Sequence, residues 1–301
     1  MPNFESRRML PCLWSKNSFF NFVVSECSPE ELSRMQEISD FWDRSHKRFL
    51  ELSQKTKFLG KNIEVGDIPK EYRSKFEELR DSAAFKSAFN QSAVEFKMVE
   101  IDKLIASQDM INLSYVDDLI KSFPKRLDFD AVFDICLSME KNSSHTSELF
   151  TQKHAIYSSI NTDLRFLGSV PIDPETLEST HIRTGGLPTK AIVLLFGFGS
   201  TPINLLNYDK RMFLNNGFHR VYALRKAGVT HIPAVVQKII NPTIEMPKTY
   251  NNLMLEQILT ADRLPLIGDF FDDELVIDLK IKSKRKAVKV SWEIEDMIIP
   301  M

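Results

Sequence analysis

Residues 213–236, FLNNGFHRVYALRKAGVTHIPAVV, combine the end of an apolar strand, two glycines, a His-Arg pair and a β-branched run. Their order predicts a strand up to about residue 215, a helix closed by Gly228, and a second strand from residue 231. A helix that starts directly at a strand end exposes the amides of its first turn, which carry a partial positive charge. The stretch therefore predicts a place where an anionic ligand can meet backbone donors.

The residues at this step suit a phosphate. Gly217 lets a ligand approach the backbone closely, and Arg220 can form two parallel hydrogen bonds with a phosphate. His219 can donate a further bond or act as an acid or base near neutral pH, and Asn215 and Asn216 add amide groups at the strand end. Asn-Gly is also typical of an ordinary turn and cap, but cations in the first turn of a helix are electrostatically unfavourable, which favours a functional role.

The composition is that of an ordinary globular chain, with 301 residues, 43% hydrophobic residues and a net charge of −2. Such a charge gives no global attraction to nucleic acid. The spacing of Cys12, Cys27 and Cys136 fits neither a metal pair nor a disulfide framework, which predicts reduced thiols and a cytoplasmic protein. His46, His145, His154 and His231 lack partners at metal-ligand spacing. No stretch suggests a signal peptide or a membrane contact.

The first part of the chain, residues 1–95, is predicted to be a mainly helical region. A capped helix start at Ser28 begins a periodic run to about residue 57, and a second helical run covers 69–91. Residues 1–25 are too aromatic for a disordered tail and are expected to pack against the body as an extended arm or short strands. This region could dock a protein partner.

The sheet is predicted from three segments. The alternation in FKMVEIDKLI, residues 96–105, predicts an opening strand. AIVLLFGFG, residues 191–199, is almost wholly apolar and predicts a buried central strand. Residues 203–215 predict a hairpin around Asp209-Lys210, a pair that lacks the glycine preferred in two-residue turns.

Two further segments lie outside this sheet, one in the middle of the chain and one near its C-terminal end. Residues 125–190 are predicted to be an insertion, and within it His181 and Arg183 suggest either a lid or a plain exposed loop. Residues 276–292 alternate on two arms and predict an amphipathic hairpin. Its basic run at 280–289 suits contact with DNA phosphates, and the solvated face of a lysine-protected edge hairpin explains it as well.

Two pieces of the chain resemble the ParB/sulfiredoxin superfamily. NNGFHRVYALRKAGVTHIPAVV is similar to the signature in which a strand ends in a Gly-x-His/Arg-Arg element, opens a helix and leads to an IPV-like strand. VEIDKLIASQDMINLSYVDDLIKSF is similar to the opening strand, Gln-bearing loop and first helix. The resemblance covers 96–124 and 191–240. It implies an α+β fold with a mixed sheet and flanking helices over 96–245. The sequence pattern predicts a helix and a β-hairpin over 246–301.

The resemblance also implies a nucleotide ligand, CTP or ATP with Mg, whose phosphates contact Gly217, His219 and Arg220. Glu100 and Asp102, near the end of the opening strand, are candidates for binding Mg²⁺ or activating a hydroxyl, with an ordinary surface acidic pair as the alternative. The candidate nucleotide-binding residues are Gln108, Asn216, Gly217, His219 and Arg220. The candidate catalytic residues are Glu100, Asp102 and His219.

The chain departs from the family in two places. Phe218 stands where sulfiredoxins carry their catalytic cysteine, and no helix-turn-helix segment follows residue 240. The main hypothesis is a protein that binds a nucleoside tri- or diphosphate and hydrolyses or transfers a phosphoryl group. The alternatives are a DNA-associated module, binding or nuclease, and a nucleotide-gated partner-binding protein without catalysis. Whether the chain is an enzyme stays open at this stage.

Overall fold

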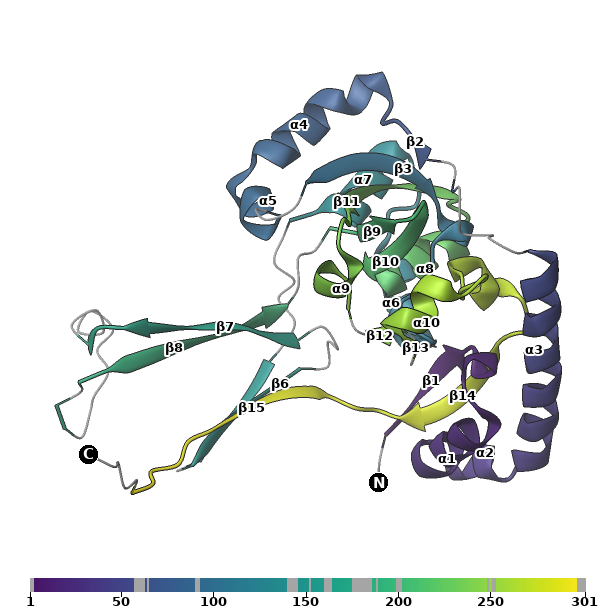
Figure 1. Cartoon of the computed structure of the whole chain (residues 1–301), viewed down its shortest axis with the longest axis horizontal. Coiled ribbons are helices and arrows are strands. Elements are labelled where there is room, and N and C mark those ends of the chain that lie inside the picture. Colours follow the sequence, from purple (N-terminus) through teal and green to yellow (C-terminus); the bar gives the residue numbers. More distant parts are fainter. Residues whose placement is uncertain are drawn as a thin grey trace. The chain divides into compact units, whose positions relative to one another are not determined.

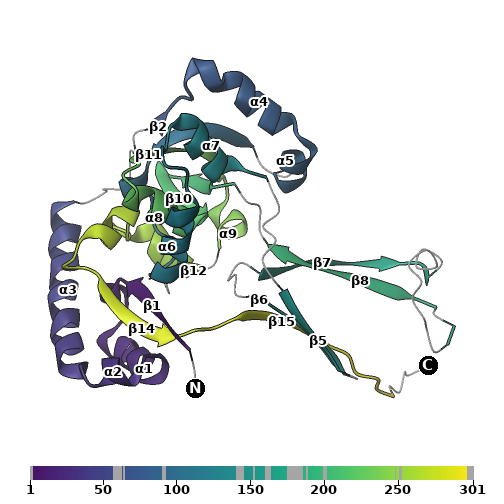
Figure 2. The ribbon, with the colours of Figure 1, turned by 180° about the vertical axis from the view of Figure 1, so that it is seen from behind.

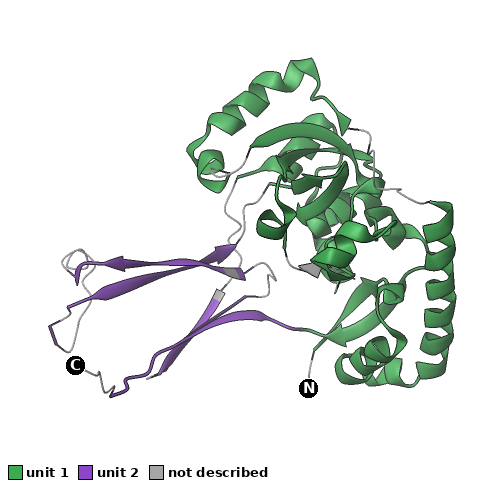
Figure 3. Ribbon diagram, viewed as in Figure 1, with its two compact units in different colours: residues 1–140, 200–283 green, residues 141–199, 284–301 purple. Residues whose placement is uncertain are grey.

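A computed structural model describes residues 3–56, 63, 65–89, 93–139, 146–151, 153–159, 164–174, 186–187, 189–198, 202–247, 249–250 and 253–296. The chain is α+β, as predicted, and divides into two compact units. Figure 3 colours unit 1, residues 1–140 with 200–283, in green, and unit 2, residues 141–199 with 284–301, in purple.

Unit 1 contains a five-stranded sheet of order β10-β9-β11-β3-β2 (Figure 1). Its strands are β2 (Val65–Gly66), β3 (Val94–Glu100), β9 (Asn204–Tyr208), β10 (Arg211–Asn216) and β11 (His231–Lys238). Strands β9 and β10 form an antiparallel hairpin, and helix α8 (Phe218–Lys226) returns the chain so that β11 runs parallel to β9. Because β11 also pairs antiparallel with β3, the sheet is mixed, as predicted.

Three helices complete this core, and Figure 2 shows them together from behind. Helix α6 (Leu113–Ser122) packs on α8, and α7 (Phe129–Leu137) packs on β11. The helices bury one face against the sheet because their apolar residues recur at helical spacing. The buried side chains that join helix and sheet include Val99, Leu205, Leu214, Tyr222 and Val235.

The turn of the β9–β10 hairpin lies where the sequence predicts it. Asp209 has φ 48° and Lys210 has φ 61°, so both residues occupy the left-handed region that a two-residue hairpin turn requires. Neither residue is a glycine, and a side chain in this region costs about 1–2 kcal/mol. The pairing of the two apolar strands therefore overrides the local preference of the turn.

The N-terminal region is not purely helical. Strand β1 (Phe4–Met9) lies between β14 (Ile277–Lys282) and β4 (Met110–Asn112) in a three-stranded sheet. The predicted helix at 28–57 is divided into α2 (Pro29–Leu32) and α3 (Met35–Lys55), and the run at 69–91 is divided into α4 (Arg73–Asp81) and α5 (Ala83–Ala88). Helices α1 (Lys16–Glu26) and α3 pack on the β14-β1-β4 sheet through a common apolar cluster.

The remaining elements of unit 1 are η1 (Pro11–Leu13), η2 (Lys70–Tyr72), η3 (Ile101–Lys103), α9 (Pro242–Glu245), β12 (Thr249–Tyr250), β13 (Leu253–Met254), α10 (Leu255–Thr260) and η5 (Ile267–Phe271). The sequence suggested that 1–95 and 246–301 flank a separate core. Instead, β1 and β14 share one sheet, so residues 1–95 and 246–283 belong to the same unit as the core, whereas residues 284–301 belong to unit 2.

The predicted C-terminal hairpin over 276–292 does not form. Strand β14 pairs with β1 in unit 1, whereas β15 (Lys286–Ser291) pairs with β6 in unit 2. The alternation was identified correctly, because Ile277, Leu279 and Ile281 are buried. Their partners are Met9 and Phe19 of the N-terminal region, which a local pattern cannot identify. The basic run at 280–289 is consequently divided between the two units.

Unit 2 is built from two small sheets. One has the order β15-β6-β5, with β5 (Thr146–Phe150) and β6 (His154–Ser159), and the other pairs β7 (Leu164–Ile172) with β8 (Ala191–Phe198). Much of the segment expected to be irregular is therefore β-structure. The prediction of a buried central strand at 191–199 is wrong, because Ile192 is 69% and Leu195 46% exposed on a strand paired only with β7 among the described residues.

Candidate functional site

Gly217 forms the step between β10 and α8. Its φ of +95° is left-handed, and a Cβ atom at this position would lie 2.7 Å from Cγ1 of Ile203. Torsion and space both require glycine here. Among the residues that the structure describes, the backbone amides of Phe218 and His219 donate no hydrogen bond. The N-terminus of α8 therefore presents donors where an anion is electrostatically favoured.

His219, the second residue of α8, faces α6. Its Nε2 accepts a hydrogen bond of 3.1 Å from the backbone N–H of Asn112, and its ring lies 5.4 Å from the ring of Tyr115. Burial, and to a smaller extent the positive charge of Arg7, lowers the pKa of His219 to about 4. The imidazole is neutral at pH 7 and carries its proton on Nδ1, since Nε2 is the acceptor. In this state His219 can donate one bond to a ligand but brings no positive charge.

Arg220, the third residue of α8, faces α7. Its Nη1 donates to the carbonyl oxygen of Ile135 at 3.1 Å, in the last turn of α7. A cation is favoured at this position because the C-terminus of a helix carries partial negative charge. Arg220 thus lies between the C-terminus of α7 and the N-terminus of α8.

Strand β1 adds two charged residues that the sequence analysis did not select. The Glu5 carboxylate accepts from Nδ2 of Asn112 at 2.8 Å and from Nε of Arg7 at 2.9 Å. Asn112 is the N-cap residue of α6, and its backbone N–H reaches His219. The N-termini of α6 and α8 therefore meet at Asn112, with the protein's own carboxylate beside them. The aromatic character of residues 1–25 pointed to packing, and nothing in the sequence placed Glu5 or Arg7 near residue 219.

Two of the predicted binding residues, Asn216 and Gln108, lie in chain segments next to this site. Nδ2 of Asn216 donates to the carbonyl oxygen of Pro202 at 3.2 Å, directly before Gly217. Gln108 is exposed and lies in the segment that leads into β4, the strand that ends at Asn112. The structure thus brings Asn216, Gly217, His219 and Arg220 together, and places Gln108 on the chain segment that leads to His219.

The two predicted carboxylates lie elsewhere. Asp102 accepts two hydrogen bonds from Arg225, at 2.6 and 2.9 Å, and Glu100 forms an ion pair of 2.7 Å with Lys103. Arg225, the partner of Asp102, is in the last turn of α8, about 12 Å along the helix axis from Gly217 at a rise of about 1.5 Å per residue. Both carboxylates are paired with cations of the chain itself, and neither is brought to the N-terminus of α8.

The described residues were also compared with the requirements of thiol chemistry, metal binding and membrane crossing. Cys12, Cys27 and Cys136 are free and buried, and burial raises the pKa of each thiol to about 12. In the part of the chain that the structure describes, no three His, Cys, Asp or Glu side chains cluster as metal ligands. No described helix has the length and apolar character needed to cross a bilayer. His181 and Arg183 lie outside the described residues.

Comparison of the chain with family models, curated proteins and solved structures gives no match.

Proposed function

We propose that the chain binds a nucleoside tri- or diphosphate, with the phosphates at the N-terminus of α8. The observation that carries this proposal is the left-handed Gly217 at the end of β10, which opens a helix whose first turn holds His219 and Arg220. Backbone amides of Phe218 and His219 would hold phosphate oxygens, and Nδ1–H of His219 would donate a further bond. Arg220 would add the positive charge that a neutral His219 does not supply.

The placement of the two family-like segments supports the same proposal. Strand β3 and helix α6 come from the first segment, and β9, β10, α8 and β11 come from the second. They are far apart in sequence, yet β3 pairs with β11 and α6 packs on α8. A ParB-like nucleotide-binding core is the proposal that this joint arrangement favours.

The enzymatic form of the proposal is hydrolysis or transfer of a phosphoryl group with Mg²⁺. Arg220 would neutralise the charge that develops on the phosphoryl oxygens. Asp102 and Glu100 would first have to leave Arg225 and Lys103 to hold the metal or accept a proton. Binding without turnover, used to gate a protein partner, is the non-catalytic form of the same site.

Titration of the chain with ATP, CTP and GTP by calorimetry, with and without Mg²⁺, tests the proposal. We expect saturable binding of at least one nucleotide and its loss in Arg220→Ala. Lys226→Ala is the matched control, because Lys226 is an exposed cation at the opposite end of the same helix. Binding that Arg220→Ala leaves unchanged, or the absence of binding to all three nucleotides, contradicts the proposal.

The same titration with a short DNA duplex at two salt concentrations separates the DNA-associated alternative. Contacts with DNA phosphates weaken steeply as salt rises, because counterions are released on binding. Steep salt dependence with DNA, together with no effect of nucleotide, would favour the DNA-associated module. Release of inorganic phosphate from a bound nucleotide would separate the enzymatic form from the gating form.

A further inference from the structure

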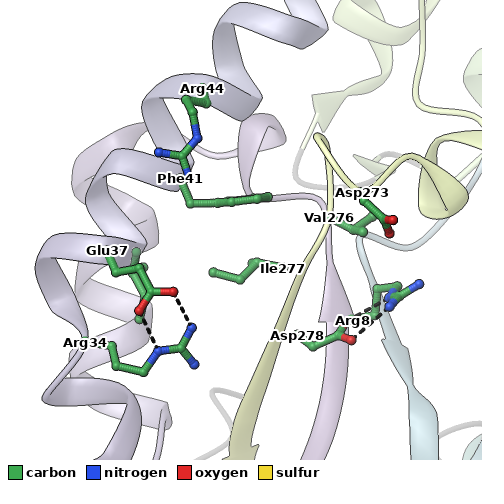
Figure 4. Close-up of a pocket in the computed structure, with 10 residues that line it drawn as sticks. Arg8, Arg34, Glu37, Phe41, Arg44, Asp273, Val276, Ile277 and Asp278 are labelled. Carbon is green, nitrogen blue, oxygen red and sulfur yellow. Dashed lines mark hydrogen bonds and ion pairs between the residues drawn. The ribbon is translucent and has the colours of Figure 1, made fainter.

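A cavity of unit 1, between helix α3 and strand β14, is lined mainly by charged side chains, four of which form two ion pairs (Figure 4). Arg34 donates to both oxygens of Glu37, at 3.0 and 2.9 Å. Arg8 donates to both oxygens of Asp278, at 2.8 and 2.9 Å. Bidentate pairs of this kind satisfy the charges of both partners. Strands β7 and β8 of unit 2 have the opposite character, because they expose apolar side chains and unpaired backbone groups.

One face of the β7–β8 ribbon is covered within unit 2. The ring of Phe196 in β8 stacks on the ring of Tyr157 in β6, with centres 4.6 Å apart. Phe166 of β7 is the cross-strand partner of Phe196, and their ring centres are 5.7 Å apart. Side chains alternate between the two faces of a strand, so Ile192 points to the same face as Phe196. Ile192 nevertheless lies beyond this packing, since it is 69% exposed.

The other face of the ribbon is open and aliphatic. Val170 of β7 and Val193 of β8 are cross-strand partners on this face, and Leu195 follows two residues after Val193. Val170 is 46%, Val193 36% and Leu195 46% exposed. Strand β8 therefore shows apolar side chains to solvent on both of its faces.

The outer edge of β8 lacks the residues that usually block strand pairing. Its eight residues, AIVLLFGF from Ala191 to Phe198, include no charged residue and no proline. Within the described part of the chain β8 pairs with β7 alone, so the backbone N–H and C=O groups on its other side form no hydrogen bond. A long, apolar and unprotected edge of this kind is a site for pairing with another strand.

The other edge strands of unit 2 are protected. Strand β7 carries Arg165 and Pro171, strand β15 carries Lys286 and Lys289, and strand β5 carries Glu148. Charged residues and proline at an edge oppose association with a further strand. Among the described strands of unit 2 that form a sheet edge, β8 is thus the one without such a residue.

We propose that β8 pairs antiparallel with β8 of a second copy of the chain, across a two-fold axis near Leu194. Such a contact uses the same strand on both copies and forms a continuous sheet of order β7-β8-β8-β7. A strand of wholly apolar residues offers nothing to a charged segment, whereas a second β8 places an apolar residue opposite an apolar residue at each position. Val193 would lie beside Leu195 of the second copy, and Ile192 beside its Phe196, so exposed side chains gain cross-strand neighbours.

The pairing also gives the ribbon what it lacks. A two-stranded ribbon is marginally stable, and additional strands stabilise it. All residues of the contact belong to unit 2, so the proposal does not depend on the nucleotide site at the N-terminus of α8.

Sedimentation velocity of the full chain over a range of concentrations tests the pairing. We expect a monomer–dimer equilibrium that Val193→Lys weakens by about tenfold or more, because two lysines become diagonal neighbours at the shared edge. Val170→Lys is the matched control. It adds the same charge to the same face, on the cross-strand partner of Val193, but it is one strand away from the contact and should leave the dimer unchanged. Both positions are exposed, so both variants should retain the fold.

Hydrogen exchange of residues 191–198 at low and high protein concentration gives a second measurement. We expect slower exchange of β8 at high concentration in the wild-type chain, and no such dependence in Val193→Lys. A dimer that Val170→Lys weakens as strongly as Val193→Lys would be held by stacking of the aliphatic faces, which contradicts edge pairing. A dimer that neither variant weakens forms elsewhere on the chain and also contradicts it. A monomer at every concentration, with no protection of β8, overturns the proposal and leaves this edge to an extended segment of a different protein.

Discussion

The backbone N–H of Asn112 donates a 3.1 Å hydrogen bond to Nε2 of His219. This bond joins the N-cap of α6 to the first turn of α8, two helices more than a hundred residues apart in the chain. A buried imidazole can accept this bond only when it is neutral, because the imidazolium has no acceptor. The packing of α6 on α8 is therefore linked to the protonation of one side chain.

The first prediction concerns the pH dependence of stability. The folded chain lowers the pKa of His219 from 6.5 to about 4, so between these values the unfolded chain binds a proton that the folded chain does not. The free energy of unfolding should therefore be unaffected by His219 above pH 6.5 and should fall as the pH is lowered toward 4. We expect the wild-type chain to lose on the order of 1–3 kcal/mol more over this window than His219→Gln, whose amide oxygen can accept from Asn112 without titrating.

Urea denaturation of both proteins at neutral pH and near pH 4 measures this difference. The other titrating groups are common to the two chains and cancel in the comparison. Equal losses of stability in the two proteins would show that His219 is not held neutral in the fold.

The second prediction separates the two reasons for glycine at position 217, which are its left-handed torsion and the lack of space for a Cβ atom. Gly217→Ala must place a side chain at φ +95° and a methyl group 2.7 Å from Cγ1 of Ile203. Gly228 has nearly the same torsion, φ +92°, but no atom of the described residues lies within 4 Å of the point that a Cβ atom would occupy there. Gly228→Ala should cost about 1 kcal/mol of unfolding free energy, for the torsion alone.

Gly217→Ala should cost about 2–4 kcal/mol, because displacement of Ile203 adds to the torsional cost. Urea denaturation of the two variants checks the difference. If both variants lose the same stability, the close approach of Gly217 to Ile203 is relieved without cost and the glycine is needed only for its torsion.

The third prediction concerns the β9–β10 turn. Lys210 has φ 61°, and glycine adopts this torsion without a steric penalty. Lys210→Gly should therefore raise the free energy of unfolding by about 0.5–1 kcal/mol. Lys210→Ala, which removes the long side chain but keeps the Cβ atom, is the control and should bring no such gain. A gain of equal size in both variants would mean that the charge or length of the lysine, and not its torsion, is unfavourable.

The turn and the site differ in how far local sequence determines them. The hairpin around Asp209, the step at Gly217 and the strand β11 were predictable because turn torsions and strand periodicity act between near neighbours. The apolar run at 191–198 shows the limit of such patterns. It identifies a strand correctly, but hydrophobicity alone does not say which sheet the strand joins, and Ile192 is largely exposed.

Long-range pairing explains the rest of the differences. Strand β14 pairs with β1 because Ile277 and Met9 contribute to one apolar cluster, a choice that no alternation within 276–292 reveals. The pairing of β1 with β4 carries Glu5 and Arg7 to Asn112, whose backbone N–H reaches His219. The residues Gly217 to Arg220 could therefore be predicted from their own sequence. Glu5 and Arg7 could not, because their position depends on the long-range pairing of strand β1.

The last prediction tests whether Glu5 competes with the proposed nucleotide. Its carboxylate lies where the N-termini of α6 and α8 meet and is bonded to Asn112 and Arg7. A phosphate bound beside His219 would be repelled by this charge, so Glu5→Gln should bind a nucleotide about three- to tenfold more tightly, with the larger effect at low salt. Gln keeps the size of the side chain and an oxygen that can accept from Asn112. Glu77→Gln, an exposed carboxylate of α4 outside this cluster, is the control for a general change in net charge. Equal nucleotide affinity in wild type and Glu5→Gln would place the bound phosphates away from Glu5, and equal gains in both variants would assign the effect to net charge alone.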